Sequence, residues 1–175
     1  MRNLLKASIG IVALFMLASF AFARGKADFN KFLKSSTEGV ANYSSKEYYE
    51  KLEFTNNKTG EKKKFSDFSE VDRAVFMALQ ADQFSHQLED LYNKWKEELK
   101  NAEETPDDEN EASKKDVTQY LEKLFELRKK NAANVEKMVN DLFTKFPDKF
   151  TKEEKEHVLK SLTEYHDKHK LIQRK

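Results

Sequence analysis

Apolar residues recur at steps of three and four along two long stretches of the chain. In the first stretch, 69–99, they fall on Ala74, Met77, Ala81, Phe84, Leu88, Leu91 and Trp95. In the second stretch, 117–146, they fall on Leu121, Phe125, Ala132, Val135, Val139, Leu142 and Phe146. This spacing places each set on one face of an α-helix. The pattern predicts two long helices, at about 69–102 and 114–146.

An acidic segment separates the two stripes. Glu103–Glu111 contains no apolar residue except Pro106, and a proline within a helical pattern ends or kinks the helix. We therefore predict a solvated turn, so that 69–146 forms a long antiparallel helical hairpin resembling a coiled coil. Each helix would be roughly 50 Å long at 1.5 Å per residue, longer than the core of a domain of this size is wide.

A shorter third helix is predicted after the hairpin, over 152–171. Thr151 stands three residues before Glu154, the spacing at which a hydroxyl and a carboxylate cap the start of a helix. The fold class is therefore mainly α, and we expect the C-terminal part, 147–175, to pack on the hairpin.

The segment 24–68 carries weaker patterns. Apolar residues one turn apart predict a short helix that ends near Gly39, and these are Phe29, Phe32 and Leu33. Ser44–Glu47 has the spacing of a second capping box. The alternation in Leu52–Thr55 is typical of a half-buried strand. With the turn-forming residues that follow, it favours a short β-hairpin over 50–65.

The first residues have the pattern of an export signal. Arg2 and Lys6 give a positive start, Ala7–Phe22 is uncharged, and Ala21–Ala23 supplies small residues around a cleavage point. We interpret 1–23 as a signal peptide removed after its last residue. This predicts an exported protein, periplasmic or extracellular, with no stable membrane insertion after cleavage.

The alternative is an uncleaved membrane anchor. The uncharged run approaches the length of about 17 residues at which a helix begins to span a bilayer. Positive charge just after the run, at Arg24 and Lys26, also resists translocation. We favour cleavage because the small-residue pattern is that of a processing site.

Charge and composition exclude several classes of protein. The 32 basic residues nearly balance the 31 acidic residues, so no net field attracts nucleic acid or anionic lipid. The chain has no cysteine, which excludes disulfides, thiol catalysis and cysteine-ligated zinc. Aromatic residues make up 12% of the chain, which argues against disorder throughout. Abundant Lys and Phe without Cys is typical of a bacterial protein.

Three of the four histidines fall in the predicted third helix, at His157, His166 and His169. The last two lie one turn apart, a spacing that allows both to bind one metal ion. A third ligand is missing from the same face, and Asp82 with His86 is the candidate pair across the bundle. No Glu-x-x-His pair recurs as it does in di-metal bundles. We therefore assign no metal ligand.

No catalytic arrangement is apparent in the sequence. Nucleophile elbows and phosphate-binding loops need glycine, and beyond the signal segment only Gly25, Gly39 and Gly60 occur. None of the three lies in such a motif. Every histidine falls in a predicted helix, so a Ser-His-Asp arrangement has no scaffold. We expect a protein that is not an enzyme and has no catalytic or cofactor-binding residue.

Two further groups have a structural and a functional interpretation. Arg128 interrupts the second stripe within the basic run Arg128–Lys130, which is either a ligand patch or a solvated helix face with an outward-pointing arginine. We favour the solvated face.

Trp95 continues the first stripe, which predicts its burial between the long helices. Tyr48 and Tyr49 line either a pocket or the core, and we favour the core.

The predicted architecture resembles, in outline, periplasmic chaperones of the Skp type, although those proteins are strongly basic. Phe150–Glu154 is similar in placement to the Leu-Thr-x-x-Gln motif of Spy-type periplasmic chaperones and metal-stress sensors. Here Phe replaces Leu and Glu replaces Gln. Since helix capping accounts for these five residues, no functional residue is transferred from either family.

Two hypotheses for function follow. The first is an exported, non-enzymatic helical interaction protein, an adaptor or a chaperone, that binds polypeptides or its own copies through an apolar stripe. The second is a small-molecule- or metal-binding helical bundle whose pocket uses Tyr48, Tyr49, Trp95 or the histidines. The first is favoured because aromatic residues at helical spacing usually belong to a core. Oligomeric state separates the two.

Overall fold

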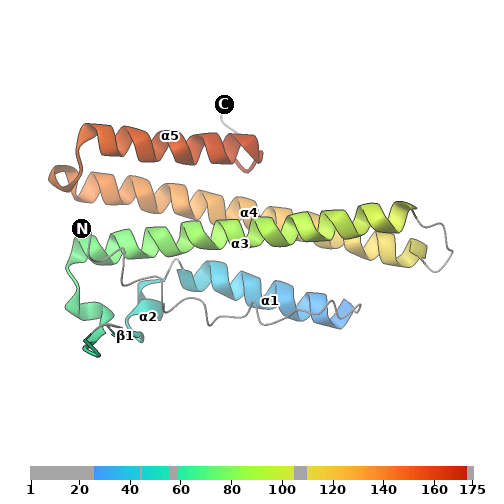
Figure 1. The fold of residues 1–175 in the computed structure, drawn as a ribbon, viewed down its shortest axis with the longest axis horizontal. Helices are drawn as coiled ribbons and strands as arrows, with labels where there is room; N and C mark the ends of the chain where they lie inside the picture. The colour runs from blue at the N-terminus through green and yellow to red at the C-terminus, as the bar shows by residue number, and fades with distance from the viewer. Residues whose placement is uncertain (1–25, 44, 56–58, 105–109, 173–175) are drawn as a thin grey trace.

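The computed structural model describes residues 26–43, 45–55, 59–104 and 110–172. These residues form a mainly helical protein, which confirms the predicted fold class (Figure 1). The predicted signal peptide, 1–23, and the turn at Pro106 lie outside the described residues.

Two long helices, α3 (Glu70–Glu104) and α4 (Asn110–Lys145), lie side by side. The end of α4 lies against the start of α3, because Lys145 of α4 forms an ion pair with Glu70. Near the other end, the rings of Trp95 and Tyr120 have centroids 5.8 Å apart. The helices are therefore antiparallel, as the two apolar stripes predict.

The starts of two helices follow from capping. The hydroxyl of Ser69 accepts a hydrogen bond from the Asp72 amide at 3.2 Å before α3. Thr151 and Glu154 form the predicted reciprocal capping box at the start of α5 (Lys152–Lys168). Each cap satisfies an amide that the first helical turn leaves without an intrahelical partner. The short 3-10 helix η4 (Pro147–Lys149) connects α4 to α5.

Helix α5 ends at residue 168, three residues before the predicted end. Lys170 has a φ of 54°, and the Leu171 amide donates to the His166 carbonyl at 2.9 Å. This left-handed residue reverses the chain, as in a Schellman motif. The side chain of Leu171 is thereby buried.

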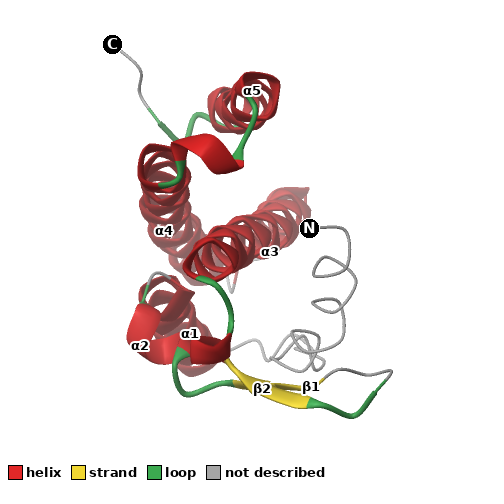
Figure 2. Ribbon diagram, turned by 90° about the vertical axis from the view of Figure 1, so that its left-hand side faces the viewer, coloured by secondary structure: helices red, strands yellow, loops and turns green. Residues whose placement is uncertain are grey.

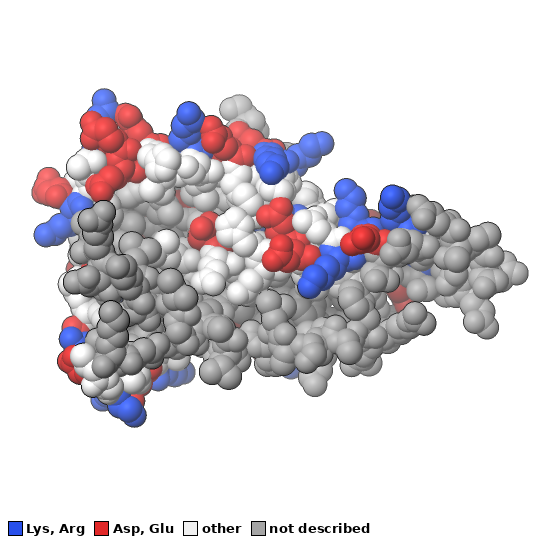
Figure 3. Space-filling model, viewed as in Figure 1, with Lys and Arg blue, Asp and Glu red and all other residues white. Residues whose placement is uncertain are grey.

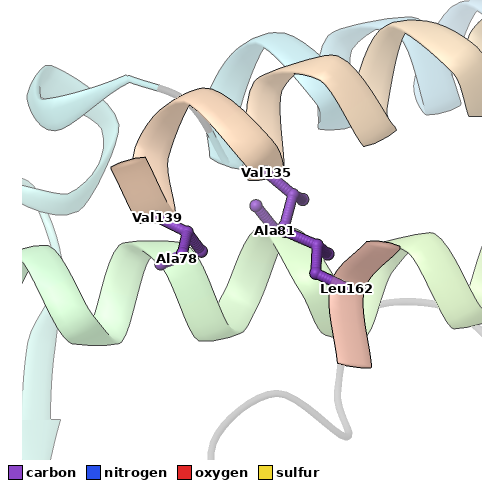
Figure 4. Packing of buried hydrophobic residues seen from close by; sticks show 5 residues of the cluster. All are labelled: Ala78, Ala81, Val135, Val139 and Leu162. Carbon is purple, nitrogen blue, oxygen red and sulfur yellow. The ribbon is translucent and has the colours of Figure 1, made fainter. Parts of the chain in front are cut away.

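Helix α4 is the central element of the core, because α1, α3 and α5 all contact it. One apolar cluster, drawn in Figure 4, joins α3, α4 and α5 through Ala78, Ala81, Val135, Val139 and Leu162. A second cluster joins α1, α3 and α4 through Val40, Leu88, Leu124 and Leu127. Each fully buried leucine or valine contributes about 1.5 to 3 kcal/mol relative to an exposed one.

Helix α1 spans Lys26–Tyr43, so the prediction that it ends near Gly39 is wrong. Gly39 lies inside the helix, where its missing side chain makes room for the ring of Phe84. A Cβ at this position would lie 2.9 Å from the Phe84 Cζ atom. The glycine therefore serves close packing of α1 on α3 instead of helix termination.

The remaining N-terminal elements are short. Helix α2 (Lys46–Tyr49) has Ser45 at its N-cap, but the Ser45 hydroxyl bonds the Glu47 carboxylate at 2.7 Å instead of capping the helix. The predicted β-hairpin is present as two antiparallel strands, β1 (Glu53–Thr55) and β2 (Lys62–Lys64). It lies beside the start of α3 and continues into the 3-10 helix η3 (Phe65–Asp67) (Figure 2).

Two strands alone are marginal in water, and here aromatic side chains hold them to the helices. The ring of Phe54 in β1 lies 5.3 Å from that of Phe76 in α3. Tyr49 stacks on the buried Phe65 at 5.2 Å and meets Phe76 edge-on at 5.7 Å. Hydrophobic packing between rings therefore holds the hairpin in place.

Candidate functional site

The helical hairpin continues beyond the end of α5 (Figure 1). The last contacts of α5 with α3 are at the level of Glu89, where Tyr165 and His169 reach its carboxylate. Past this level, apolar side chains along the seam of the hairpin are half-buried. We call these residues the distal patch: Tyr92, Trp95, Leu99 and Phe125.

Aromatic contacts organise the distal patch. The rings of Tyr92 and Phe125 have centroids 5.9 Å apart, and Trp95 packs edge-on against the buried Tyr120. Trp95 is half-buried, so the prediction that it is buried between the helices is wrong in degree. It does lie at the helix seam, where it packs, partly buried, against the apolar cluster that α1 shares with α3 and α4.

Charged side chains surround the apolar surfaces. In Figure 3, lysine, arginine, aspartate and glutamate alternate along α5, and uncharged surface lies below them. Two large apolar side chains are strongly exposed among the described residues, Leu79 at 46% and Val158 at 40%. On the face that Figure 3 shows, both signs of charge alternate among the described residues.

Arg128 is buried at 4% exposure, so the prediction of a solvated arginine on the helix surface is wrong. Its guanidinium carbon lies 5.0 Å from the centre of the Tyr92 ring, a cation–π distance. The Nε and Nη2 atoms have no hydrogen-bond partner among the described residues. Lys129 is half-buried and Lys130 is exposed. The three side chains of the basic run Arg128–Lys130 therefore do not form one patch.

Asn131 lies one turn from Arg128 and is also buried. Its side-chain amide donates to the Ala81 carbonyl at 2.9 Å and to the Ser85 hydroxyl at 2.7 Å. These bonds join α4 to α3 within the seam. They also fix the axial alignment of the two helices, because a shift would leave a buried amide without acceptors.

The C-terminal half of α5 meets this polar part of the seam. Tyr165 donates a hydrogen bond to the Glu89 carboxylate at 2.9 Å, and His169 Nε2 lies 3.0 Å from the same carboxylate. Burial and the hydrogen bond to Glu89 raise the pKa of Tyr165 to about 12. His166 is fully buried, with Nδ1 4.0 Å from the Glu136 carboxylate. We call Glu89, Arg128, Glu136, Tyr165, His166 and His169 the polar cluster.

The structure separates His166 from His169, but it brings His169 and His86 to the same carboxylate, that of Glu89. His166 faces Glu136 of α4 and His169 faces Glu89 of α3, whereas His157 is exposed. His86 lies 3.9 Å from the Glu89 carboxylate, through Nδ1. Within the described residues, no group of three or more His, Asp or Glu side chains has a geometry that holds a metal ion.

Tyr48, Tyr49 and Trp95 do not share a pocket. Tyr49 is buried against Phe65, and burial raises the pKa of its hydroxyl. It packs on Phe76, whereas Trp95 lies 19 positions further along the same helix, about 28 Å away at the helical rise. The tyrosines therefore belong to the aromatic core of the N-terminal part.

A shallow groove of about 440 Å³ lies between α1 and α4. Its walls carry two leucines and mixed charges, and it is lined by Leu33, Thr37, Glu122, Lys123, Glu126, Leu127 and Lys130. None of these residues was expected to form a site. The groove has the size of a small ligand, but the charges on its rim are solvated and of both signs.

Sequence reasoning missed the burial of the polar cluster, although one signal was present. Arg128 stands four residues after Leu124, and Asn131 stands three residues after Arg128 and four before Val135, so both continue the apolar stripe of α4. Position on the stripe predicts burial even when the residue is polar. The residues of the polar cluster that come from α5 had no comparable signal in the sequence, since their contacts depend on how that helix docks.

No family model, curated protein or solved structure matches the chain. Within the described residues, none of the helices combines the length and apolar character needed to span a membrane.

Proposed function

We propose that the protein is an exported, non-enzymatic helical interaction protein, an adaptor or chaperone that binds polypeptides or its own copies through the distal patch. The observation that carries this proposal is the partial exposure of Tyr92, Trp95, Leu99 and Phe125 beyond the end of α5. Tryptophan, tyrosine and arginine dominate the binding energy of protein interfaces. Two of these types occur in the patch, and Arg128 lies directly beneath Tyr92.

The surroundings of the patch support a polypeptide as the ligand. Lys129 lies 5.2 Å above the Phe125 ring and pairs with Glu126 at 2.8 Å, so charged side chains border the apolar surface. An apolar centre with a polar rim is the usual organisation of a protein interface. Removal of 1–23 leaves 30 basic and 31 acidic residues, and this small net charge keeps repulsion between copies low.

The test is light scattering on the exported protein across a concentration series, with Trp95 emission recorded in parallel. The chain has one tryptophan, so its spectrum reports the distal patch directly. We expect a mass above that of the monomer, or a blue shift of Trp95 when a permanently unfolded polypeptide is added. Leu99→Glu should weaken either response about tenfold or more, because it places a charge in a desolvated contact.

Val158→Glu is the matched control, since it makes the same change at an exposed apolar residue on α5. It should leave both responses intact. A strict monomer whose Trp95 emission is insensitive to unfolded polypeptide would overturn the proposal. If that monomer also lost thermal stability on addition of a chelator, the metal-binding bundle would take its place.

A further inference from the structure

One edge of the Arg128 guanidinium has no hydrogen-bond acceptor. The side chain is 4% exposed, and its two nitrogens without a partner among the described residues are Nε and Nη2. The N–H bonds of these two atoms run parallel on the same edge of the guanidinium plane, which is the arrangement that holds a carboxylate through two hydrogen bonds. The unpaired edge therefore has the chemistry of a carboxylate site.

The rest of the guanidinium is engaged. The ring of Tyr92 lies over it, 5.0 Å from the guanidinium carbon, and it also interacts with the Tyr165 hydroxyl of α5. Glu89, one turn before Tyr92 on α3, is taken by two side chains of α5: the Tyr165 hydroxyl at 2.9 Å and His169 Nε2 at 3.0 Å. Arg128 thus stands where the contacts of α5 end and the distal patch begins.

The face of the hairpin that α5 covers continues beyond that helix (Figure 1). Tyr165 and His169 in the last turns of α5 reach Glu89, whereas α3 runs on for 15 residues to Glu104. This length corresponds to about 22 Å at the helical rise. A second helix of about 15 residues therefore fits on the hairpin end to end with α5.

Two aromatic rings form the apolar part of this uncovered length. Tyr92 follows Glu89 by one turn on α3, and Phe125 precedes Arg128 by one turn on α4, so each continues the face that meets α5. Both side chains are half-buried, and their ring centroids are 5.9 Å apart. A helix docked here would place an apolar stripe on these rings, as α5 places Leu162 on the apolar cluster of Figure 4.

The charges beside these rings are mainly positive. The half-buried Lys129 lies 5.2 Å from the centre of the Phe125 ring, and Lys96 is exposed on α3. Glu126 pairs with Lys129 at 2.8 Å, but Glu122 and Glu126 also line the shallow groove between α1 and α4, on another side of α4. Together with the buried guanidinium, the two lysines favour an acidic partner.

We propose that the distal patch binds an amphipathic helix of another polypeptide, and that an acidic side chain of this helix pairs with the Nε and Nη2 edge of Arg128. The inference rests on the proposed function and names the chemistry of its partner. The bound helix lies end to end with α5, with its apolar stripe on Tyr92 and Phe125. Because the guanidinium edge is buried, the half-buried Tyr92 ring moves aside as the carboxylate enters.

This role also accounts for a charged residue on the apolar stripe of α4. A buried donor without an acceptor reduces the stability of the fold, whereas the same donor paired with a carboxylate of a ligand adds to affinity. Each buried polar group without a partner calls for an explanation, and arginine is among the residue types that dominate binding energy at interfaces. The guanidinium is thus expected to serve binding and not folding.

The test uses pairs of synthetic helical peptides that differ in one side chain. Each peptide has about 15 residues, the length of the uncovered face, with leucines along one stripe and a glutamate or a glutamine beside that stripe. The variable residue is moved by one turn from pair to pair, and anisotropy of a fluorescent label measures binding to the exported protein. At least one glutamate peptide should bind about tenfold more tightly than its glutamine counterpart, because close charge pairs across an interface are coupled this strongly.

Substitutions on α4 assign this preference. Arg128→Met should bind both peptides of the pair equally. Arg128→Lys keeps the charge but lacks the parallel N–H bonds, so it should lose most of the preference. Lys130→Met is the matched control, since it removes the same charge from a residue that lines the groove between α1 and α4, and it should keep the preference in full. Circular dichroism checks the fold of each variant, and Arg128→Lys decides the matter if Arg128→Met does not fold.

Equal binding of the glutamate and glutamine peptides by the wild type, or binding of neither, would overturn the inference. A preference that survives in Arg128→Met would do the same. If the protein forms a dimer without peptide and Arg128→Met abolishes it, the guanidinium edge belongs to a second copy and the choice of partner is wrong. Equal binding would still leave the distal patch as a surface for polypeptides, whereas failure of the light-scattering test would remove the proposed function itself, so the two failures are distinguishable.

Discussion

The guanidinium of Arg128 occupies a position on the apolar stripe of α4, beneath Tyr92 and next to the polar contacts of α5. A buried cation is costly unless it is paired and fully hydrogen-bonded. Here two of its nitrogen atoms, Nε and Nη2, have no acceptor among the described residues. We therefore expect the long aliphatic part of the side chain to stabilise the seam by packing, and the incompletely hydrogen-bonded charged end to lower the stability of the fold.

Replacement of Arg128 tests this division. Arg128→Met keeps most of the volume and removes the charge, so it should leave the free energy of unfolding unchanged or raise it by about 1 kcal/mol. Arg128→Ala also removes the volume and should lie about 2 to 4 kcal/mol below the methionine variant. Urea unfolding followed by circular dichroism measures both. A methionine variant as unstable as the alanine variant would show that the guanidinium itself stabilises the fold.

At the scale of the elements, α1 makes one notably close contact with α3. Its Gly39 lies against the Phe84 ring, and a methyl group there would overlap Phe84 Cζ at 2.9 Å. Helix propensity alone favours alanine over glycine by about 1 kcal/mol. Packing of α1 on α3 therefore opposes the local preference, and we expect the packing term to be the larger one.

The two terms can be separated by combining substitutions. Gly39→Ala should destabilise the wild type by about 1 to 2 kcal/mol, because the ring must move in a packed core. In a Phe84→Ala background the same change should stabilise the protein by about 1 kcal/mol, since only the propensity remains. Denaturant unfolding of the four proteins gives the coupling energy.

Ser35→Ala, at an exposed position of α1, is the control for propensity alone and should have an effect below about 0.5 kcal/mol. If Gly39→Ala has the same effect with and without Phe84, the ring does not set the requirement for glycine. The contact between α1 and α3 would then depend on other side chains.

At the scale of the molecule, the arrangement is asymmetric. Helix α4 is covered by α1, α3 and α5, whereas the far end of the hairpin extends beyond α5 (Figure 1). The proposed function uses this asymmetry, because the distal patch lies on the part of the hairpin that extends beyond α5.

Export is tested by the mass of the mature protein. We expect cleavage after Ala23, so that the chain begins at Arg24, because small residues flank this point after an uncharged run. Intact-mass spectrometry of the protein recovered from outside the cytoplasm checks the position. A chain that retains Met1 would instead favour the membrane anchor.

The helical class and the antiparallel hairpin followed from the sequence because their determinants are local. The spacing of apolar residues sets which face of each helix is buried, and the hydroxyl and carboxylate pairs at Ser69 and Thr151 set where two of the helices begin. Proline, glycine and left-handed residues are less informative without context. Gly39 was expected to end a helix, yet it lies inside one.

The polar cluster, by contrast, was decided only by tertiary structure. Arg128 continues the stripe of α4, but whether such a side chain is solvated or buried depends on what packs over it. The answer comes from Tyr92 of α3 and from Tyr165 and His169 of α5. Those contacts join residues that are distant in the chain, and no local sequence pattern predicts how α5 docks. Whether a side chain is buried depends on the neighbouring elements that pack against it.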